Sequence, residues 1–113
     1  MYAATKVVII AERVILDGVC DLLEAHGATG YTYMSAGGKG SRGVRRQNRA
    51  QVSSVSSNVK IEAIVADAEQ AAAISEAVAA KYFDHYSGIT YLQPVEIVRR
   101  HKFLKAASAD TDS

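Results

Sequence analysis

The sequence predicts an α+β protein with a ferredoxin-like βαββαβ fold, and three observations lead to that prediction. The chain has 113 residues, about half of them hydrophobic, which suits one domain with one core. Four short segments rich in β-branched or aromatic residues alternate with two segments of helical periodicity, in the order β-α-β-β-α-β. A long glycine-rich segment separates the two halves. Two β-α-β units that share one antiparallel sheet form this fold.

The first half of the chain contains a strand, a helix and a second strand. Residues 6–11 read KVVIIA, a short β-branched run that is typical of a buried strand. Residues 13–26 show helical spacing of apolar side chains, and Gly27 stands where a helix-terminating glycine belongs. The side chains expected in the core are Leu16, Val19, Cys20 and Leu23. The alternation in 30–36, GYTYMSA, predicts the second strand.

The second half repeats this order. Residues 59–66, VKIEAIVA, predict the third strand. Asp67 and Gln70 are spaced to cap a helix, because Asp67 can accept a first-turn N–H while Gln70 reaches back. The helix is expected to reach about residue 82 and to bury Ala71, Ile74, Val78 and Tyr82. Residues 89–98, ITYLQPVEIV, predict the fourth strand, in which Pro94 requires a sheet edge or a bulge.

Both helices of such a fold cover the same face of the sheet, so the other face needs a separate cover. The first and third strands read as apolar on both faces, through VVII and through Ile61, Ala63, Ile64 and Val65. Large exposed apolar faces are rare in monomeric proteins, and another subunit is the simplest cover.

Charge and composition exclude several functional classes. Thirteen Lys and Arg against twelve Asp and Glu leave a net charge of +1, which directs the whole molecule to neither nucleic acid nor membrane. No signal peptide is recognisable, and no segment approaches the roughly 20 apolar residues of a membrane span. We therefore expect a cytoplasmic protein without membrane insertion, and a disordered tail at 104–113. The single cysteine, Cys20, is expected to be a small buried hydrophobe.

The chain shows no pattern for a metal site or a catalytic centre. His26, His85 and His101 lack metal-ligand spacing, and no Ser/His/Asp or Cys/His set can be assembled with specificity. A phosphate-transfer enzyme of the acylphosphatase type would need an Asn positioned with an Arg, and the asparagines here give no convincing set. We expect neither a metal ion, nor a cofactor, nor an enzyme.

Residues 35–49 read SAGGKGSRGVRRQNR and combine four glycines with five cations, and no acid occurs between Glu24 and Glu62. Glycines let a backbone approach an anion and the cations can neutralise it, so the segment favours phosphate binding. It is not a Walker A loop, since Gly40 follows Lys39 where Ser or Thr should stand. One alternative is a solvated hairpin tip. Another is a nucleic-acid-binding ferredoxin-like domain that uses the arginines, although the third strand offers no stacking aromatics.

Several segments resemble the PII signal-transduction family, over residues 5–103 as a whole. They are GATGYT at 27–32, the mid-chain loop, VKIEAIVADAEQAAAISEAV at 59–78 and GITYLQPVEIVRR at 88–100. Two stretches, AGGKGSRGVR at 36–45 and AAKYFDHYSGITY at 79–91, are similar in particular to the carbon-linked branch. That branch contains the cyanobacterial bicarbonate-transporter regulator and its carboxysome-associated relatives.

The resemblance implies one PII-like domain at 1–103 that assembles as a homotrimer. It implies adenine-nucleotide sites for AMP, ADP, ATP or cyclic AMP in the clefts between subunits, with bicarbonate as a further ligand. Residues 37–57 correspond to the mobile T-loop, which engages a protein partner in bicarbonate transport or in the carboxysome. This loop has no tyrosine, so uridylylation lacks an acceptor, and the C-terminal cysteine pair of the cyanobacterial regulator is missing.

The resemblance also assigns individual residues to the nucleotide site. The turn residues Ala28, Thr29 and Gly30 correspond to adenine contacts. The remaining nucleotide-binding candidates are Gly37, Gly38, Lys39, Gly40, Ser41, Arg42, Arg45, Ile64, Gly88, Ile89 and Arg100. Gly88 and Ile89 belong to the B-loop, which reaches the phosphates from the neighbouring subunit. The candidates for bicarbonate are Gly38, Lys39 and Gly40.

Overall fold

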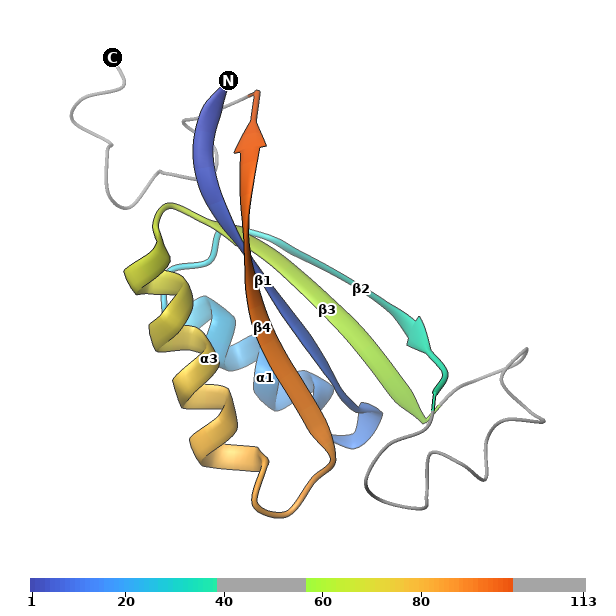
Figure 1. Cartoon of the computed structure of the whole chain (residues 1–113). Coiled ribbons are helices and arrows are strands. Elements are labelled where there is room, and N and C mark those ends of the chain that lie inside the picture. The colour runs from blue at the N-terminus through green and yellow to red at the C-terminus, as the bar shows by residue number, and fades with distance from the viewer. Residues whose placement is uncertain (39–56, 99–113) are drawn as a thin grey trace.

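The structure is a computed structural model that describes residues 1–38 and 57–98, and these form a two-layer α+β fold. A four-stranded antiparallel sheet in the order β2-β3-β1-β4 carries two helices on one face (Figure 1). The elements are β1 Tyr2–Glu12, the 3-10 helix η1 Arg13–Ile15, α1 Leu16–Ala25, β2 Tyr31–Ala36, β3 Asn58–Val65, α3 Ala68–Tyr82 and β4 Gly88–Ile97. The predicted ferredoxin-like arrangement is confirmed.

The element bounds differ from the prediction mainly in the first strand. β1 begins at Tyr2 rather than at residue 6, because its first residues pair with β4, where Tyr2 lies opposite Ile97. The predicted helix at 13–26 begins with the 3-10 turn η1, and the α-helix proper starts at Leu16. Pro94 lies in β4, an edge strand of the sheet, as its missing N–H requires.

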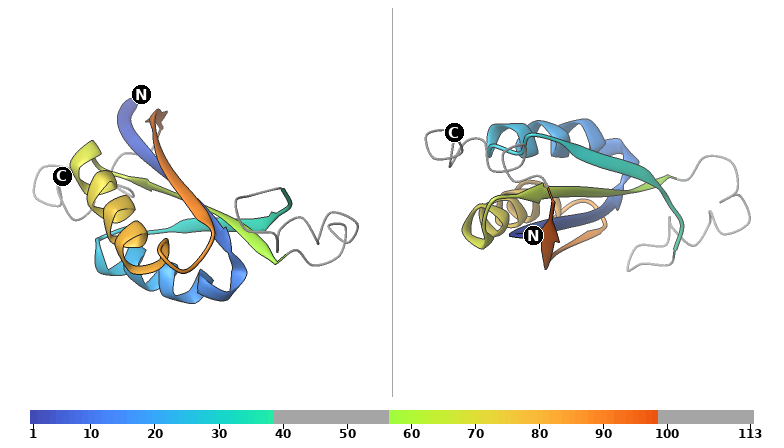
Figure 2. Two further views of the ribbon diagram at one scale, coloured as in Figure 1. Left: turned by 60° about the horizontal axis from the view of Figure 1, so that its bottom comes forward. Right: turned by 90° about the horizontal axis from the view of Figure 1, so that it is seen from above.

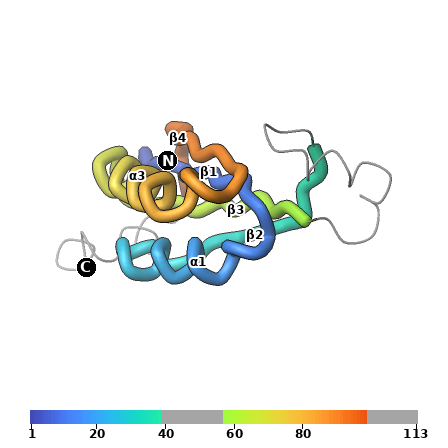
Figure 3. The backbone as a smooth tube through the Cα atoms, turned by 90° about the horizontal axis from the view of Figure 1, so that it is seen from below, coloured from blue at the N-terminus to red at the C-terminus, as the bar shows by residue number. Residues whose placement is uncertain are grey.

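The core lies between the helices and one face of the sheet (Figure 2). Its strand residues are Val7, Ile9, Ala11, Val59, Ile61, Ala63 and Val65, and its helical residues come from both α1 and α3. Of the predicted helix residues, Val19, Leu23, Ala71, Ile74 and Val78 are fully buried and Cys20 is buried. Leu16 and Tyr82 pack against this core while only partly buried. Seen from below, α3 lies beside β1 and β4 while α1 lies beside β2 (Figure 3).

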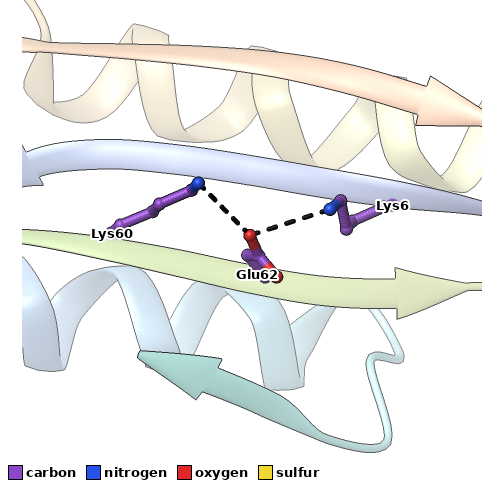
Figure 4. A network of polar contacts seen from close by, with 3 residues as sticks. All are labelled: Lys6, Lys60 and Glu62. Carbon is purple, nitrogen blue, oxygen red and sulfur yellow. Dashed lines mark ion pairs between the residues drawn. The ribbon is translucent and has the colours of Figure 1, made fainter. Parts of the chain in front are cut away.

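The opposite face, here called the open face, is less apolar than predicted. Alternation along β1 and β3 turns Lys6, Val8 and Ile10, and Lys60, Glu62 and Ile64, toward this face. The Glu62 carboxylate lies 3.7 Å from the Lys6 ammonium and 3.5 Å from that of Lys60 (Figure 4). The prediction that these strands carry apolar side chains on both faces holds for Val8, Ile10 and Ile64, but it did not include the charged network at the centre of the open face.

Apolar side chains nevertheless surround this network. Val8 is fully buried between Glu62 and Tyr91 on the neighbouring strands. Met34 on β2 is exposed, as are Ile89 and Tyr91 on β4. The pairing of these strands with β3 and β1 places all three side chains on the open face. No helix in the described part of the chain is long and apolar enough to cross a membrane.

Candidate functional site

The predicted site residues within 1–38 and 57–98 lie at two opposite ends of the sheet (Figure 1). At one end Ser35 lies opposite Val59, Val59 opposite Ala11, and Ala11 opposite Gly88. We call the segments 12–13, 35–38, 57–58 and 86–89 at this end the loop end. The other end holds residues 26–30, before β2, and residues 64–70, where β3 passes into α3. We call it the turn end.

The turn end begins with a helix stop that requires glycine. Gly27 adopts φ 90°, a left-handed conformation that side chains disfavour. Its N–H donates to Glu24 O at 3.1 Å, and the Ala28 N–H donates to Leu23 O at 3.0 Å. This pair of hydrogen bonds is the Schellman motif, which confirms the predicted termination at Gly27.

One side chain of α3 ties this turn to the rest of the turn end. The Gln70 N–H donates to Asp67 Oδ1 at 2.8 Å, which confirms Asp67 as the helix cap. Gln70 Oε1 accepts from the Ala66 N–H at 3.2 Å, so the side chain reaches back, but to the residue before the cap rather than to Asp67 itself. Gln70 Nε2 in addition donates to His26 O at 3.0 Å.

The adenine candidates form a partly open surface at this end. Thr29 is exposed, whereas Ala28, Gly30 and Ile64 are half-buried. Ala28 packs against the core. A Cβ at Gly30 would meet nothing within 4 Å. Continuing the β2–β3 register by one residue from Tyr31 and Ala63 places Gly30 opposite Ile64, so the two candidates are neighbours.

At the loop end, two side chains from the end of β1 hold the neighbouring segments. The Glu12 carboxylate accepts a hydrogen bond from the Ser87 N–H at 2.5 Å. The Arg13 guanidinium donates to Ser35 Oγ at 2.6 Å, and the Arg13 N–H donates to Ser57 O at 2.6 Å. Neither role was predicted from the sequence, although the adjacent pair Glu12–Arg13, directly after a buried strand, was a signal for it.

The glycines of the loop end differ in their surroundings. A Cβ on Gly88 would lie 2.5 Å from the Phe83 ring and 2.9 Å from Ile10 O, so no larger residue fits there without a shift. Gly37 and Gly38 are exposed after β2, and a Cβ at Gly38 would meet nothing within 4 Å. Gly88 is therefore a packing glycine, while the two others leave their backbone accessible.

A further polar group lies beside Gly88. The Ser87 hydroxyl is buried, with the residue 3% exposed, and has no hydrogen-bond partner among the described residues. A buried hydroxyl without a partner costs free energy, and a ligand oxygen could pair with this one only after a local shift that exposes it. Ser87 was not predicted from the sequence, because a serine in a short connection carries no signal of its own.

The two ends are too far apart to meet around one small molecule within one chain. From Gly30 to Gly37, seven residue steps of about 3.3 Å separate the two groups by about 23 Å along β2, and three strand spacings of about 4.8 Å separate β2 from β4. The candidates that the structure brings together are Ala28, Thr29, Gly30 and Ile64 at the turn end, and Gly37, Gly38, Gly88 and Ile89 at the loop end. It does not bring these two groups together.

The remaining candidates, Lys39, Gly40, Ser41, Arg42, Arg45 and Arg100, lie outside the described residues, as do most of the 37–57 loop and the 104–113 tail. Residues 1–38 and 57–98 contain no group of three or more His, Cys, Asp or Glu that could hold a metal ion. Burial raises the pKa of the Cys20 thiol, assisted by the carboxylates of Asp17 and Glu24. The hydrogen bond to Glu24 raises the pKa of the Tyr31 hydroxyl, so this group stays a donor.

Comparison with known proteins places this arrangement in context. A family model described as nitrogen regulatory protein P-II matches residues 4–102. A protein of Thermus thermophilus described as a PII-like signalling protein is 28% identical and is matched over 91% of this chain and 97% of its own, with a TM-score of 0.73. CPII from Thiomonas intermedia, in a structure with ADP and bicarbonate bound, is 27% identical over 90% of this chain and 95% of its own, with a TM-score of 0.75.

The similarity in fold extends to a more distant structure. GlnK of B. subtilis, in complex with ATP, is 18% identical over 84% of each chain, with a TM-score of 0.54. These findings confirm the resemblance to the PII family that GATGYT and the other segments indicated. The assignment to the carbon-linked branch stays a prediction.

Proposed function

Because the chain belongs to the nitrogen regulatory protein P-II family, we propose that this PII-like regulatory protein is a non-catalytic sensor of adenine nucleotides. Its ligands would be AMP or ADP, with ATP and cyclic AMP as candidates, and bicarbonate beside the phosphates. The similar CPII protein has been solved with ADP and bicarbonate bound, which supports both ligand classes.

The observation that carries the proposal is the separation of the two groups of candidates. Adenine candidates lie at the turn end and phosphate candidates at the loop end, at opposite ends of the sheet. A nucleotide can contact both groups only if the turn end of one copy meets the loop end of another. A repeated head-to-tail contact forms a ring if its rotation closes and an open filament if it does not, and the family implies a closed ring of three.

The open face supplies the surface for this assembly. Ile89 and Met34 are exposed there, beside the Lys6–Glu62–Lys60 network. The Glu62 carboxylate lies against both ammonium groups of that network within one chain, so a second copy can cover the three groups, with a net charge of one, at a smaller desolvation cost than three isolated charges. We therefore propose that the open faces of the copies meet in the trimer.

At the loop end, the nucleotide phosphates would find N–H groups and positive charge. The backbone N–H groups of Gly37 and Gly38 are accessible, and the buried Ser87 hydroxyl would be a further donor after a local shift that exposes it. We place Lys39, Arg42 and Arg45 around the phosphates, and bicarbonate among Gly38, Lys39 and Gly40. Charge-assisted hydrogen bonds of this kind are the strongest available to an oxyanion.

The output of the sensor would be carried by the loop. Residues 37–57 follow directly on β2 and lead into β3. A ligand bound at the loop end would therefore lie next to both ends of the loop. The proposed partner is a protein of bicarbonate transport or of the carboxysome, in keeping with the resemblance to the carbon-linked branch.

Calorimetric titration tests the ligand proposal. The protein is titrated with ADP, AMP, ATP and cyclic AMP, each with and without bicarbonate, while light scattering measures the mass in solution. We expect a trimer with one nucleotide site per chain and tighter nucleotide binding in bicarbonate. A protein that binds none of the four nucleotides would contradict the sensor function.

A mixing experiment tests whether the site is shared. Gly30→Leu disables the turn end and Gly38→Glu the loop end, and both positions have open space for a side chain. Each variant alone should bind no ADP. After the two are unfolded and refolded together, random mixing should restore about a quarter of the wild-type sites, because half of the loop ends and half of the turn ends are intact. No restoration, despite mixed oligomers, would mean that one chain holds the whole site.

The alternative of a nucleic-acid-binding domain is not favoured. The open face of the two central strands carries Lys6, Val8, Ile10, Lys60, Glu62 and Ile64, without an aromatic side chain for base stacking. Binding to single-stranded RNA at physiological salt, with a steep fall as salt rises, would revive it.

A further inference from the structure

A single amide side chain joins the two segments that carry the adenine candidates. Gln70 contacts the backbone at His26, before the turn 27–30, and at Ala66, after β3. We propose that Gln70 is a positioning residue for the adenine half of the site, which sets the spacing between the turn and the end of β3. This inference rests on the proposed function.

The contact with the turn fixes the peptide on which the helix stop depends. Gln70 Nε2 donates to His26 O at 3.0 Å, across 44 residues of sequence. That carbonyl belongs to the peptide that enters Gly27, whose φ is 90°. A Cβ built on Gly27 would lie 3.0 Å from the same Nε2 atom, so the amide lies against the turn itself. A shift of the Gln70 head group would therefore move Ala28, Thr29 and Gly30 as well.

The second contact holds the end of β3, which lies across the adenine candidates from the turn. Gln70 Oε1 accepts from the Ala66 N–H at 3.2 Å, directly after β3 ends at Val65. Ile64 lies two residues earlier and faces Gly30 in the continued register. One planar amide thus binds both backbones, and it adds a side-chain link to the β2–β3 pairing beside Gly30 and Ile64.

The choice of glutamine at position 70 is informative, because helix capping alone does not require glutamine there. Glutamate serves equally well at this position of a capping box, and its charge suits a helix N-terminus. A carboxylate could still accept from the Ala66 N–H, but it could not donate to His26 O and would repel that oxygen. Glutamine combines the donor and the acceptor whereas glutamate keeps only the acceptor, so Gln70→Glu removes the turn contact and leaves the cap.

This difference gives a test that separates positioning from stability. ADP and GDP affinities are measured by calorimetry for the wild-type protein, Gln70→Glu and Gln70→Ala, together with the thermal unfolding midpoint. We expect Gln70→Glu to unfold near the wild-type midpoint, because the favourable charge at the helix N-terminus offsets the lost hydrogen bond, yet to bind ADP about fivefold more weakly, the factor for one ordinary hydrogen bond. The preference for ADP over GDP should shrink by the same factor, because only the base half is displaced. Gln70→Ala should lose both stability and ADP affinity.

Ser75→Ala is a matched control on the same helix, because it removes the hydrogen bond to Thr90 at 2.8 Å, away from the turn. It should leave ADP affinity and base preference unchanged. Wild-type ADP affinity and preference in Gln70→Glu would overturn the inference while the sensor function stands. An equal loss for ADP and GDP would also overturn it, since that pattern indicates a general effect of the substitution. Failure of the wild-type protein to bind ADP would overturn the sensor function itself.

Discussion

The two ends of the sheet are held by different kinds of contact. The turn end is fixed mostly by uncharged hydrogen bonds: the Schellman pair at Gly27 and Ala28, and the amide of Gln70. The loop end depends on charged side chains from the end of β1, where Glu12 binds the Ser87 N–H and Arg13 binds Ser35. The turn end is thus a preformed wall, whereas at the loop end a ligand phosphate can take part in the same charge interactions.

Within the proposed function, the two ends recognise different parts of the nucleotide. The flat base of a nucleotide needs a surface that keeps its shape, and the turn end offers one without ordering cost on binding. The phosphates need donors and positive charge, which the loop end and the cationic segment after it can supply. The following predictions test the contrast, from the largest expected effect to the smallest.

The largest effect is expected from the arginines that follow the loop end. If Arg42 and Arg45 bind phosphate, replacing either one with Ala should weaken ADP binding by about 1.5–3 kcal/mol, the range for hydrogen bonds to charged groups. Arg49→Ala is the matched control and should cost far less. Calorimetry on the three variants measures this. Equal losses at all three positions would indicate diffuse electrostatics rather than a phosphate site.

Next in size is the packing glycine of the loop end. Gly88→Ala should lower the free energy of unfolding by about 2 kcal/mol, because its Cβ would press on the Phe83 ring and on Ile10 O. Gly30→Ala at the turn end is the control, since its Cβ meets nothing within 4 Å. Urea denaturation compares the two. A stable Gly88→Ala variant would show that the β4 start can shift and is less rigid than this contact implies.

A smaller effect is expected at the glycine that ends α1. Gly27→Ala should cost about 1 kcal/mol of stability, because an L side chain is disfavoured at φ 90°. The new methyl group would also crowd Gln70 Nε2. We therefore expect ADP affinity to fall with stability, as in Gln70→Ala. If ADP affinity is unchanged in a measurably destabilised Gly27→Ala protein, the turn does not form the adenine wall.

The smallest effect is expected at Glu12. Its carboxylate lies where a phosphate would approach the Ser87 N–H, so Glu12→Gln removes a like charge from the proposed phosphate site. The amide oxygen can still accept the Ser87 hydrogen bond. We expect ADP affinity to rise by about 0.5 kcal/mol, the scale of a partly solvated charge pair, and AMP affinity to rise less. Reduced ADP affinity in this variant would contradict the prediction and would indicate that Glu12 contacts the ligand directly.

Much of the fold could be predicted from local patterns alone. The β-branched runs, the helical spacing of Val19 and Leu23, and the Asp67–Gln70 cap all follow from interactions within a few residues, and the structure contains them. The same holds for the helix stop at Gly27. The family segments, such as GATGYT, indicated candidate site residues without any geometry, and the family match supports the resemblance itself.

Contacts between residues distant in sequence depend on which strands pair, so local patterns could not predict them. The sequence alone determined the elements and their order, because propensity and periodicity are local properties, and the family resemblance supplied the candidate site residues. Tertiary structure decided that Lys6, Lys60 and Glu62 share the open face, that Glu12 reaches Ser87, and that Gln70 reaches His26. It also decided that the nucleotide candidates stand at opposite ends of one sheet. The reason is physical: these contacts join residues far apart in sequence, and only the strand register fixes which of them face each other.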